Sequence, residues 1–468
     1  MRLFAAATLL LAVACLGCRG TPRQPSILLV VLDTVRVDDV SAYGRIAGTT
    51  PTVDALARGG LRYAHAYSNA SWTLPAHASL FTGLLPHEHG VRLGSNALRD
   101  DIPTLAERLH AAGYETVSIS ENPWLGEGNH MSRGFERFTA LDKYGLGPTG
   151  PDVSEVVGDW LRSRRDDRPF FLFVNIMDAH ADYKVRDVNP FLPAGVTAEA
   201  ARRVSQDPRD YICAKRTGDP DLAILRGLYR GDVQAADAKL ARVLARFPAP
   251  PITVVLSDHG ECFGERGLVE HDIGLADALL HIPLVIAHLP HVAPAVIDTP
   301  VQIADVMPTV LAWAGVPPVA ALTGRPLPTG EPAAMPPREI VSEYTDYTTA
   351  ASLPEWMEDK VRQLAWRGRA HCGPQDRVFG DMRSIIAFPY KLQWYAGYPP
   401  ELFDVARDPA EEHDLSAAEP ERVARLSNEL DAVGAERMAE APPSAIGPEL
   451  AARLRALGYL GGDAPVGQ

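Results

Sequence analysis

The sequence of 468 residues predicts an α/β fold, a doubly wound and mostly parallel sheet flanked by helices, followed by a smaller C-terminal α+β subdomain. Three short runs lack polar alternation and are rich in β-branched or aromatic residues, as in central strands covered on both faces: "SILLVVLD", "PFFLFVNIMDAH" and "PITVVLSDHGE". Stretches with helical periodicity lie between them, such as "TPTVDALARGG" and "DVQAADAKLARVLARF". This repeated alternation of strand and helix is typical of parallel sheets with helices on both faces.

An export signal is expected over residues 1–18. "MRLFAAATLLLAVACLGC" combines one arginine, an apolar stretch too short to span a bilayer, and small residues and cysteines. The sequence thus predicts an exported protein of the periplasm or cell envelope. Lipid attachment at Cys15 or Cys18 would make it a lipoprotein, and membrane contact is expected only through such an anchor. Plain cleavage of the leader is the alternative, because neither cysteine has leucine three residues upstream.

Bulk composition limits the classes of protein. A content of 46% apolar residues supports a large core and more than one domain. The net charge of -14 argues against a dedicated nucleic-acid binder, which needs a basic surface. Beyond the leader, Cys213, Cys262 and Cys372 allow at most one disulfide among themselves.

We place a catalytic α/β domain at residues 26–335 and the C-terminal subdomain at residues 336–468. The boundary follows the density of proline and glycine in "GVPPVAALTGRPLPTGEPAAMPPRE". Residues 181–221 lack periodicity and are expected to form a lid or insertion. In the subdomain, strands are expected within residues 384–397 and 399–409, and helices at residues 420–433 and 447–460.

"SWTLPAHASLFTG" predicts a short helix with a hydroxyl residue at its start. Thr73 precedes Pro75, and Gly83 ends the apolar run. The Thr73 hydroxyl could cap the helix. It could instead be a nucleophile, because the positive end of a helix favours an anion.

The polar strand ends predict a metal site. Their position would gather the side chains on one rim of the sheet, although they are far apart in sequence. Two carboxylates on one rim repel each other unless a cation lies between them, and a histidine completes a set of metal ligands. Strand-end residues that only cap neighbouring loops are the alternative. The residues expected on the rim are Asp33, Asp178, His180, Asp258 and His259.

Thr73 would complete the metal site as a fourth ligand beside Asp33, Asp258 and His259. Coordination of a hydroxyl to a divalent cation is one way to activate a weak nucleophile. The mixed oxygen and nitrogen donors favour one Mn²⁺, Zn²⁺ or Mg²⁺ ion over Ca²⁺, which prefers oxygen ligands.

These residues and others carry a resemblance to the sulfatase-like branch of the alkaline phosphatase superfamily. The resemblance implies that Asp33, Asp258 and His259 bind the metal and that Thr73 occupies the nucleophile position. It further implies that His180 and His271 contact the transferred group or the leaving group. The motifs that carry it include "LDTVRVDDVSAYG", "TLPAHASLFTGLLPHEHGV", "FLFVNIMDAH", "LSDHGECFGERG", "HDIGLADALLHIPLVI" and "ELFDVARDPAEEHDL".

The departures from the family pattern bear on the reaction. A sulfatase has cysteine or serine at the nucleophile position, which is oxidised to formylglycine, and arginine four residues later. Here Thr73 and His77 stand at these positions, and threonine cannot give the aldehyde, so no formylglycine is expected. His77 could bond the nucleophile or simply pack. Thr34 stands where a second aspartate is expected, and "SENPWL" stands where the family has lysine and histidine.

Superfamily members with threonine at this position resemble nucleotide pyrophosphatases, lipoteichoic acid synthases and phosphoethanolamine transferases, which act through a phosphothreonine. The resemblance thus implies a metal-dependent hydrolase or transferase that cleaves phosphate mono- or diesters through Thr73. Its substrate would be a small-molecule, lipid-headgroup or glycan ester. Two alternatives stay open: a sulfuric ester hydrolase that works without formylglycine, and an inactive binding protein for anionic glycans.

Some residues near the motifs have weaker interpretations. Asp178 could hold a second metal with His180. Arg36 and Asp38 are expected to brace the loop after Asp33 by an ion pair. Structural roles are expected for the two histidines of "LLPHEHGV", and no role is assigned to the glutamate and cysteine that follow "SDHG".

Overall fold

The computed structural model describes residues 24–92, 97–141, 151–165, 167–206, 208–271, 273–319, 322–330, 338–345, 377 and 380–434. The expected leader with its two cysteines, Cys372 and the helix expected at residues 447–460 lie outside these ranges. Among the described helices, none is both long and apolar enough to cross a membrane.

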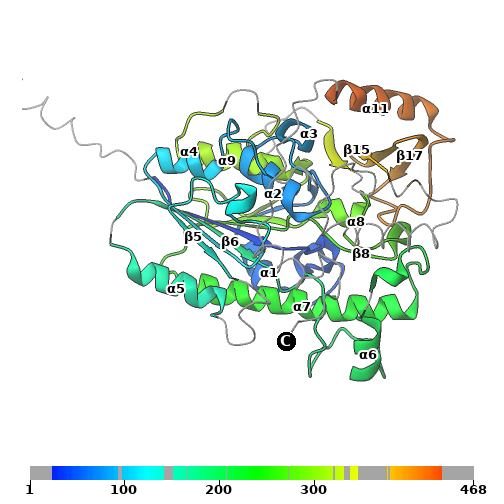
Figure 1. Ribbon diagram of the computed structural model, residues 1–468, viewed down its shortest axis with the longest axis horizontal. Helices are drawn as coiled ribbons and strands as arrows, with labels where there is room; N and C mark the ends of the chain where they lie inside the picture. The colour runs from blue at the N-terminus through cyan, green and yellow to red at the C-terminus, as the bar shows by residue number, and fades with distance from the viewer. Residues whose placement is uncertain are drawn as a thin grey trace, which may run out of the picture.

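An eight-stranded sheet forms the centre of the molecule, in the order β12–β2–β11–β7–β1–β6–β4–β5 (Figure 1). Only β11 runs antiparallel to its neighbours β7 and β2, and the other adjacent pairs are parallel. The predicted doubly wound, mostly parallel sheet is therefore confirmed. The strands are β1 (Ile27–Leu32), β2 (Leu61–Tyr63), β4 (Glu115–Ser120), β5 (Arg137–Ala140), β6 (Phe170–Ile176), β7 (Ile252–Leu256), β11 (Leu284–Ala287) and β12 (Ala295–Ile297).

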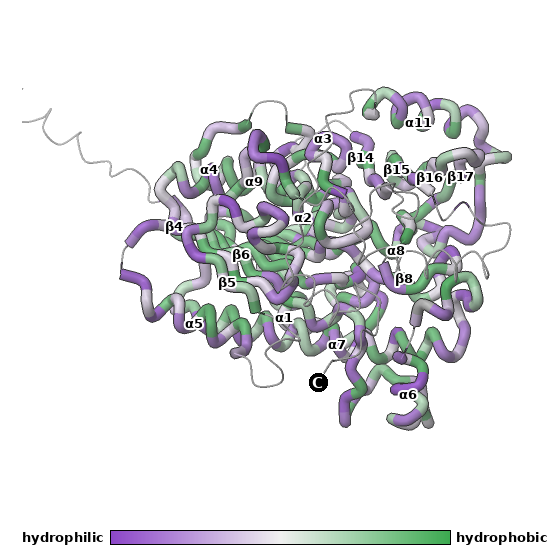
Figure 2. The backbone as a smooth tube through the Cα atoms, viewed as in Figure 1, coloured by the Kyte–Doolittle hydropathy of each residue, from purple (hydrophilic) through white to green (hydrophobic). Residues whose placement is uncertain are grey.

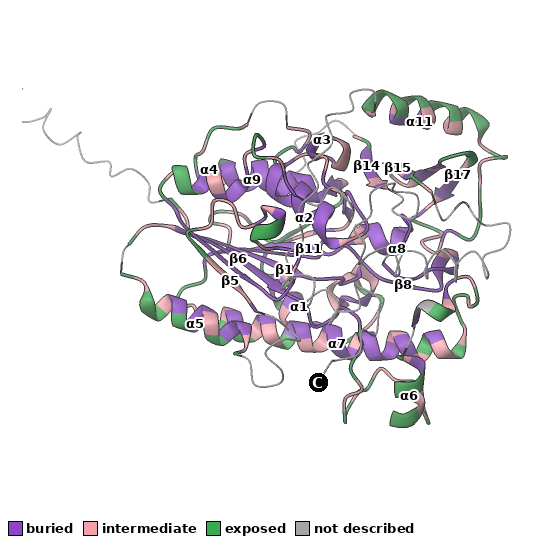
Figure 3. Ribbon diagram, viewed as in Figure 1, coloured by how far each residue is buried: buried purple, intermediate pink, exposed green. Residues whose placement is uncertain are grey.

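Strand β1 explains the continuous apolar runs. Successive side chains of a strand point to opposite faces, and all six residues of β1 are buried. Its even-numbered residues pack in one apolar cluster and its odd-numbered residues in another. Each cluster is closed by a layer of helices, so neither face of the strand meets water (Figure 3). Figure 2 accordingly shows a band of hydrophobic strands between helices of mixed hydropathy.

The two helical layers agree with the sequence pattern. One layer packs in the first cluster and contains α1 (Pro51–Arg58), α5 (Val153–Ser163) and α7 (Pro220–Leu244). The other contains α2 (Thr73–Thr82), α4 (Leu105–Ala111) and α9 (Val306–Trp313). Helix α7 begins earlier than its periodicity predicts, because the Asp219 side chain caps it by accepting from the Asp221 N–H, and Pro220 fits the first turn.

The C-terminal unit is an antiparallel sheet covered by one helix. Strands β14 (Ile340–Tyr344), β15 (Met382–Ala387), β16 (Tyr390–Tyr395) and β17 (Tyr398–Asp404) pair in sequence order. Helix α11 (Pro420–Val433), which matches the expected helix, buries Leu426 and Leu430 against the sheet. The expected strand segment at residues 384–397 forms most of a hairpin, with its turn at Phe388–Pro389.

Short elements complete the described chain. The described part of residues 181–221 is mostly irregular, in line with its lack of periodicity, and holds a short α-helix, a 3-10 helix at Pro208–Tyr211 and the first two residues of α7. Cys213 in this segment is disulfide-bonded, whereas Cys262 is a buried free thiol. The short elements are α3 (Pro86–His89), α6 (Ala198–Val204), α8 (Asp277–Leu280), β3 (Ala66–Tyr67), β8 (Cys262–Phe263), β9 (Val269–Glu270), β10 (His281–Ile282) and β13 (Val301–Gln302).

Candidate active site

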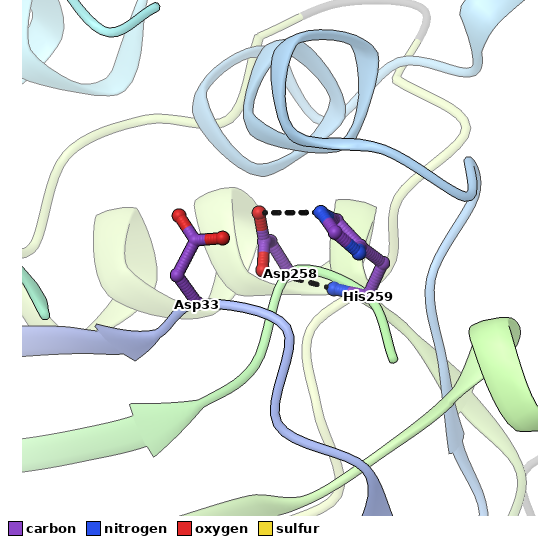
Figure 4. Close-up of side chains that lie close together, drawn as sticks. All are labelled: Asp33, Asp258 and His259. Carbon is purple, nitrogen blue, oxygen red and sulfur yellow. Dashed lines mark hydrogen bonds and ion pairs between the residues drawn. The ribbon is translucent and has the colours of Figure 1, made fainter. Parts of the chain in front are cut away.

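The carboxyl ends of adjacent parallel strands meet at one rim of the sheet. Asp33 follows β1 directly, and Asp258 and His259 follow the neighbouring β7 (Figure 4). One ligand atom from each of these three buried residues lies within 4.8 Å of the other two. Residues separated by more than 220 positions in the sequence thus form one compact cluster, as expected for strand ends of an α/β sheet.

The donor set fits a divalent cation. Asp33 Oδ1 and Asp258 Oδ2 are buried and have no hydrogen-bond partner, which is costly for carboxylate oxygens unless a positive charge is close. His259 Nδ1 donates to the Gly260 carbonyl at 3.0 Å. Its Nε2 therefore carries the lone pair and lies 3.3 Å from Asp258 Oδ2. A carbonyl that fixes the tautomer in this way is a common support for a metal-binding histidine.

The electrostatics of the cluster also favour a cation. Burial and, next, repulsion from Asp33 raise the pKa of Asp258 to about 7. Burial raises the pKa of Asp33, but attraction to the surrounding imidazoles, His180 foremost, outweighs it, so this pKa lies below its usual value. Burial and the neighbouring His271 lower the pKa of His259 to about 4. At neutral pH the His259 imidazole is therefore neutral and able to act as a ligand.

Thr73 does not cap its helix. The extended backbone that marks a cap position occurs at Trp72, and no side-chain capping bond is present. Thr73 is instead the first helical residue, so the alternative in which its hydroxyl caps the helix is wrong. Its Oγ1 lies 3.4 Å from His259 Nε2 and 3.3 Å from Asn122 Nδ2. The hydroxyl therefore faces the carboxylate and imidazole cluster.

Asn122 is a site residue that the sequence reasoning missed. Its Nδ2 donates to Asp33 Oδ2 at 2.8 Å and to Thr73 Oγ1 at 3.3 Å. Its Oδ1 accepts from the Trp124 N–H at 3.0 Å, which fixes the orientation of the amide. Asn175, in β6, donates to the same Asp33 oxygen at 3.0 Å. The strand-end rule that selected Asp33 could have found Asn122, because it follows β4 closely.

His77 lies one helical turn beyond Thr73. Its Nδ1 donates to the Thr73 carbonyl at 2.9 Å and lies 3.5 Å from Asp258 Oδ2. Its ring meets the rings of Phe81 and Phe173 edge to face. His77 therefore bonds the backbone of Thr73 rather than its hydroxyl, and it also packs in the core.

His180 and His271 lie beside the cluster. Their ring centroids are 4.9 Å apart, and the His271 ring is 4.6 Å from that of His259. His180 Nδ1 donates to the Ala181 carbonyl at 2.6 Å, and His271 Nδ1 donates to Glu261 Oε1 at 2.9 Å. Three imidazoles thus line one side of the site.

Asp178 takes part in a different interaction. It forms an ion pair with Lys239, whose Nζ also donates to Glu121 Oε1 at 2.6 Å. Within the part of the chain that the structure describes, the one cluster of three potential metal ligands omits both Asp178 and His180. The geometry therefore gives no support to the second metal considered for this pair.

The remaining expectations concern residues outside the chemistry. The Arg36 guanidinium binds both carboxylate oxygens of Asp38 at 2.8 Å, so the expected brace after Asp33 is present. His87 pairs with Glu343. His89 Nε2 lies 3.2 Å from the Ser79 hydroxyl, and its Nδ1 accepts from the Val91 N–H at 3.0 Å, which agrees with the expected structural role.

The family model described as Sulfatase matches residues 25–316. The chain belongs to the sulfatase family. It is 28% identical to arylsulfatase A of Bos taurus, over 87% of this chain and 86% of that protein. It is 22% identical to delta 4,5-hexuronate-2-O-sulfatase of Bacteroides thetaiotaomicron, over 86% of each. Its fold is similar to that of the phosphonate monoester hydrolase of Agrobacterium radiobacter, with a TM-score of 0.68, 20% identity and coverage of 88% of this chain and 96% of that one.

Family membership makes the chain a sulfatase-like hydrolase of the alkaline phosphatase superfamily, whose members act on ester bonds. The sulfatase family is metal-dependent, in agreement with the donor set described above. The family does not decide which ester is cleaved.

Proposed function

We propose that this protein is an exported, metal-dependent hydrolase or transferase that cleaves phosphate mono- or diesters with Thr73 as nucleophile. The observation that carries the proposal is the Thr73 hydroxyl, which cannot be converted to formylglycine and lies 3.4 Å from His259 Nε2 within the cluster. Its substrate would be a small-molecule, lipid-headgroup or glycan ester.

Asp33, Thr73, Asp258 and His259 would hold one divalent cation, with Mn²⁺, Zn²⁺ or Mg²⁺ favoured over Ca²⁺ by the imidazole ligand. When bound, such a cation lowers the pKa of a coordinated alcohol and offsets the negative charge of the transferred group.

The chain's own groups support an attack by Thr73. In the first step Thr73 Oγ1 loses its proton and bonds phosphorus, the bond from phosphorus to the leaving oxygen breaks, and the proton ends on that oxygen to give the free alcohol. The position of Thr73 at the start of α2 stabilises negative charge on its oxygen. The oriented Asn122 amide donates to the same oxygen and would stabilise the negative charge that develops there when Thr73 loses its proton. Water or an acceptor alcohol then takes the phosphoryl group and restores Thr73.

Three departures from the sulfatase pattern support a phosphate over a sulfate ester. The formylglycine precursor is absent, and His77, at the position of the family's arginine, is engaged with the Thr73 carbonyl and the aromatic core. Glu121 lies in the segment where the family has lysine and histidine, and its carboxylate forms an ion pair with Lys239. Sulfate ester hydrolysis is the second candidate, because the named relatives include arylsulfatase A.

Export and domain organisation belong to the same proposal. The apolar leader at residues 1–18 supports export to the periplasm or cell envelope, with a lipid anchor at Cys15 or Cys18 as one form of it. The disulfide at Cys213 adds support, because disulfides persist in oxidising compartments. We assign catalysis to residues 26–335 and propose that residues 181–221 and 336–468 contribute substrate specificity.

Turnover of matched esters tests the proposal. We expect the purified chain with Mn²⁺, Zn²⁺ or Mg²⁺ to hydrolyse 4-nitrophenyl phosphate or bis(4-nitrophenyl) phosphate faster than 4-nitrophenyl sulfate. Thr73→Ala should abolish turnover. Thr82→Ser is the matched control, because the Thr82 hydroxyl bonds the Ala78 carbonyl and the Leu84 N–H, neither of which belongs to the cluster. Full activity of Thr73→Ala would refute the nucleophile, and faster turnover of the sulfate would refute the substrate class.

A further inference from the structure

The three histidines of the site differ in what holds them. His180 and His259 each donate from Nδ1 to the main-chain carbonyl of the residue that follows, at 2.6 and 3.0 Å. His271 donates from Nδ1 to a side-chain carboxylate, Glu261 Oε1, at 2.9 Å. The Nδ1 bond of His271 therefore depends on a separate, replaceable side chain, whereas the Nδ1 bonds of His180 and His259 depend on the main chain.

A short β-ribbon creates the contact. Strands β8 and β9 pair antiparallel, with Cys262 opposite Glu270 and Phe263 opposite Val269. Glu261 and His271 occupy the next position on each side of this ribbon, so the register brings them face to face. Glu261 and His271 are 0% and 3% exposed. Water therefore competes little for this hydrogen bond, and the low local dielectric strengthens it.

The contact fixes the tautomer of His271. An ionised carboxylate accepts and does not donate, so in the neutral imidazole Nδ1 carries the proton and Nε2 carries the lone pair. Glu261 does not join the described cluster of metal ligands, which consists of Asp33, Asp258 and His259. The effect of Glu261 is therefore exerted through His271.

We propose that Glu261 is a positioning residue that holds His271 as the Nδ1–H tautomer and presents Nε2 to the reacting ester. This inference rests on the proposed function in one respect, the contact of His271 with the substrate. The carboxylate of a Ser-His-Asp triad acts on its histidine in a similar way, and its replacement lowers turnover about 10⁴-fold.

The tautomer can be measured without any substrate. In the full chain with ¹⁵N-labelled histidine, we expect the side-chain nitrogen shifts of His271 to report Nδ1–H. Glu261→Ala removes the acceptor, so the Nδ1–H population should fall. Glu265→Gln is the matched control, because Glu265 is a buried carboxylate in the same loop that bonds Arg36 at 2.7 Å instead of an imidazole. An unchanged Nδ1–H population in folded Glu261→Ala would overturn the inference.

A double-mutant cycle tests the consequence for turnover. Glu261→Gln, which keeps the shape of the side chain, should lower kcat at least about 10²-fold in the wild-type background. It should have almost no further effect in a His271→Ala background, because the two residues act as one unit. Equal losses in both backgrounds would show a merely structural role and overturn the inference, although Thr73-dependent turnover would still support the proposed function. If the wild-type chain cleaves neither ester, the proposed function fails and the nitrogen shifts decide the inference about Glu261.

Discussion

Asn122 donates hydrogen bonds both to the nucleophile position, Thr73, and to the metal ligand Asp33, and its replacement by alanine, compared with that of Asn175, separates the two effects. The change removes the 3.3 Å bond to Thr73 Oγ1 and the 2.8 Å bond to Asp33 Oδ2. It also leaves the Trp124 N–H without the amide oxygen that it now bonds at 3.0 Å. Asn175→Ala is the matched comparison, because Asn175 bonds Asp33 at 3.0 Å and has no bond to Thr73.

The expected magnitudes follow from these contacts. Loss of a donor to a developing oxyanion costs about 10²–10³ in kcat, or roughly 3–4 kcal/mol. We expect a loss of this order in Asn122→Ala at saturating metal. Asn175→Ala removes a bond to a charged group, worth about 1.5–3 kcal/mol. Because Asp33 keeps its bond from Asn122 in that variant, we expect mainly weaker metal binding and a smaller loss of kcat.

Two assays distinguish these outcomes. Turnover of a nitrophenyl ester at saturating metal gives kcat, and calorimetric titration of the metal-free protein gives the metal dissociation constant. Thermal unfolding of each variant shows whether the fold is retained. If kcat of folded Asn122→Ala stays within about 3-fold of wild type, the amide does not support the reaction and this reasoning is refuted.

Three further predictions concern metal binding and the buried charges of the site. The pKa of Asp258 is raised to about 7 in the fold. The metal-free fold should therefore lose stability as the pH rises from the pKa of Asp258 in the unfolded chain towards 7. The gain in Tm on adding metal should therefore be larger at pH 8 than at pH 5, and an equal gain would contradict it. Lys239→Met removes the cation that pairs with the buried carboxylates of Glu121 and Asp178 and should cost about 3–5 kcal/mol by denaturant unfolding; a loss below about 1 kcal/mol would contradict it. Gly260→Ala would place Cβ 2.0 Å from the Ala278 carbonyl, so metal content by elemental analysis should fall, and full occupancy would contradict it.

The sheet and most of the strand-end cluster could be predicted from the sequence, because both follow from local patterns of residues. Continuous apolar runs predicted β1, β6 and β7, and the polar residues after β1 and β7 meet because parallel strands end at one edge. The helix at residues 420–433 was predicted with its bounds, since Pro420 and Gly434 mark its ends.

Other features depended on contacts between distant segments. The role of Thr73 could not be decided locally, because the cap position shifts by one residue to Trp72 and the hydroxyl contacts Asn122 and His259, which follow distant strands. Asp178 follows β6 as the rim argument requires, yet it pairs with Lys239 from α7, a side chain that no periodicity links to it. The partner of His271 follows from the register of a two-residue ribbon, which is too short to give a sequence signal.

Acid quenching during turnover tests the central claim most directly. The wild-type chain, mixed with metal and a nitrophenyl phosphate ester and quenched in the steady state, would be digested and analysed by mass spectrometry. We expect one phosphoryl group on the peptide that contains Thr73, and none on the same peptide of Thr73→Ala. A phosphoryl group on another residue, or turnover by Thr73→Ala without any trapped intermediate, would contradict the assignment of this threonine as the nucleophile.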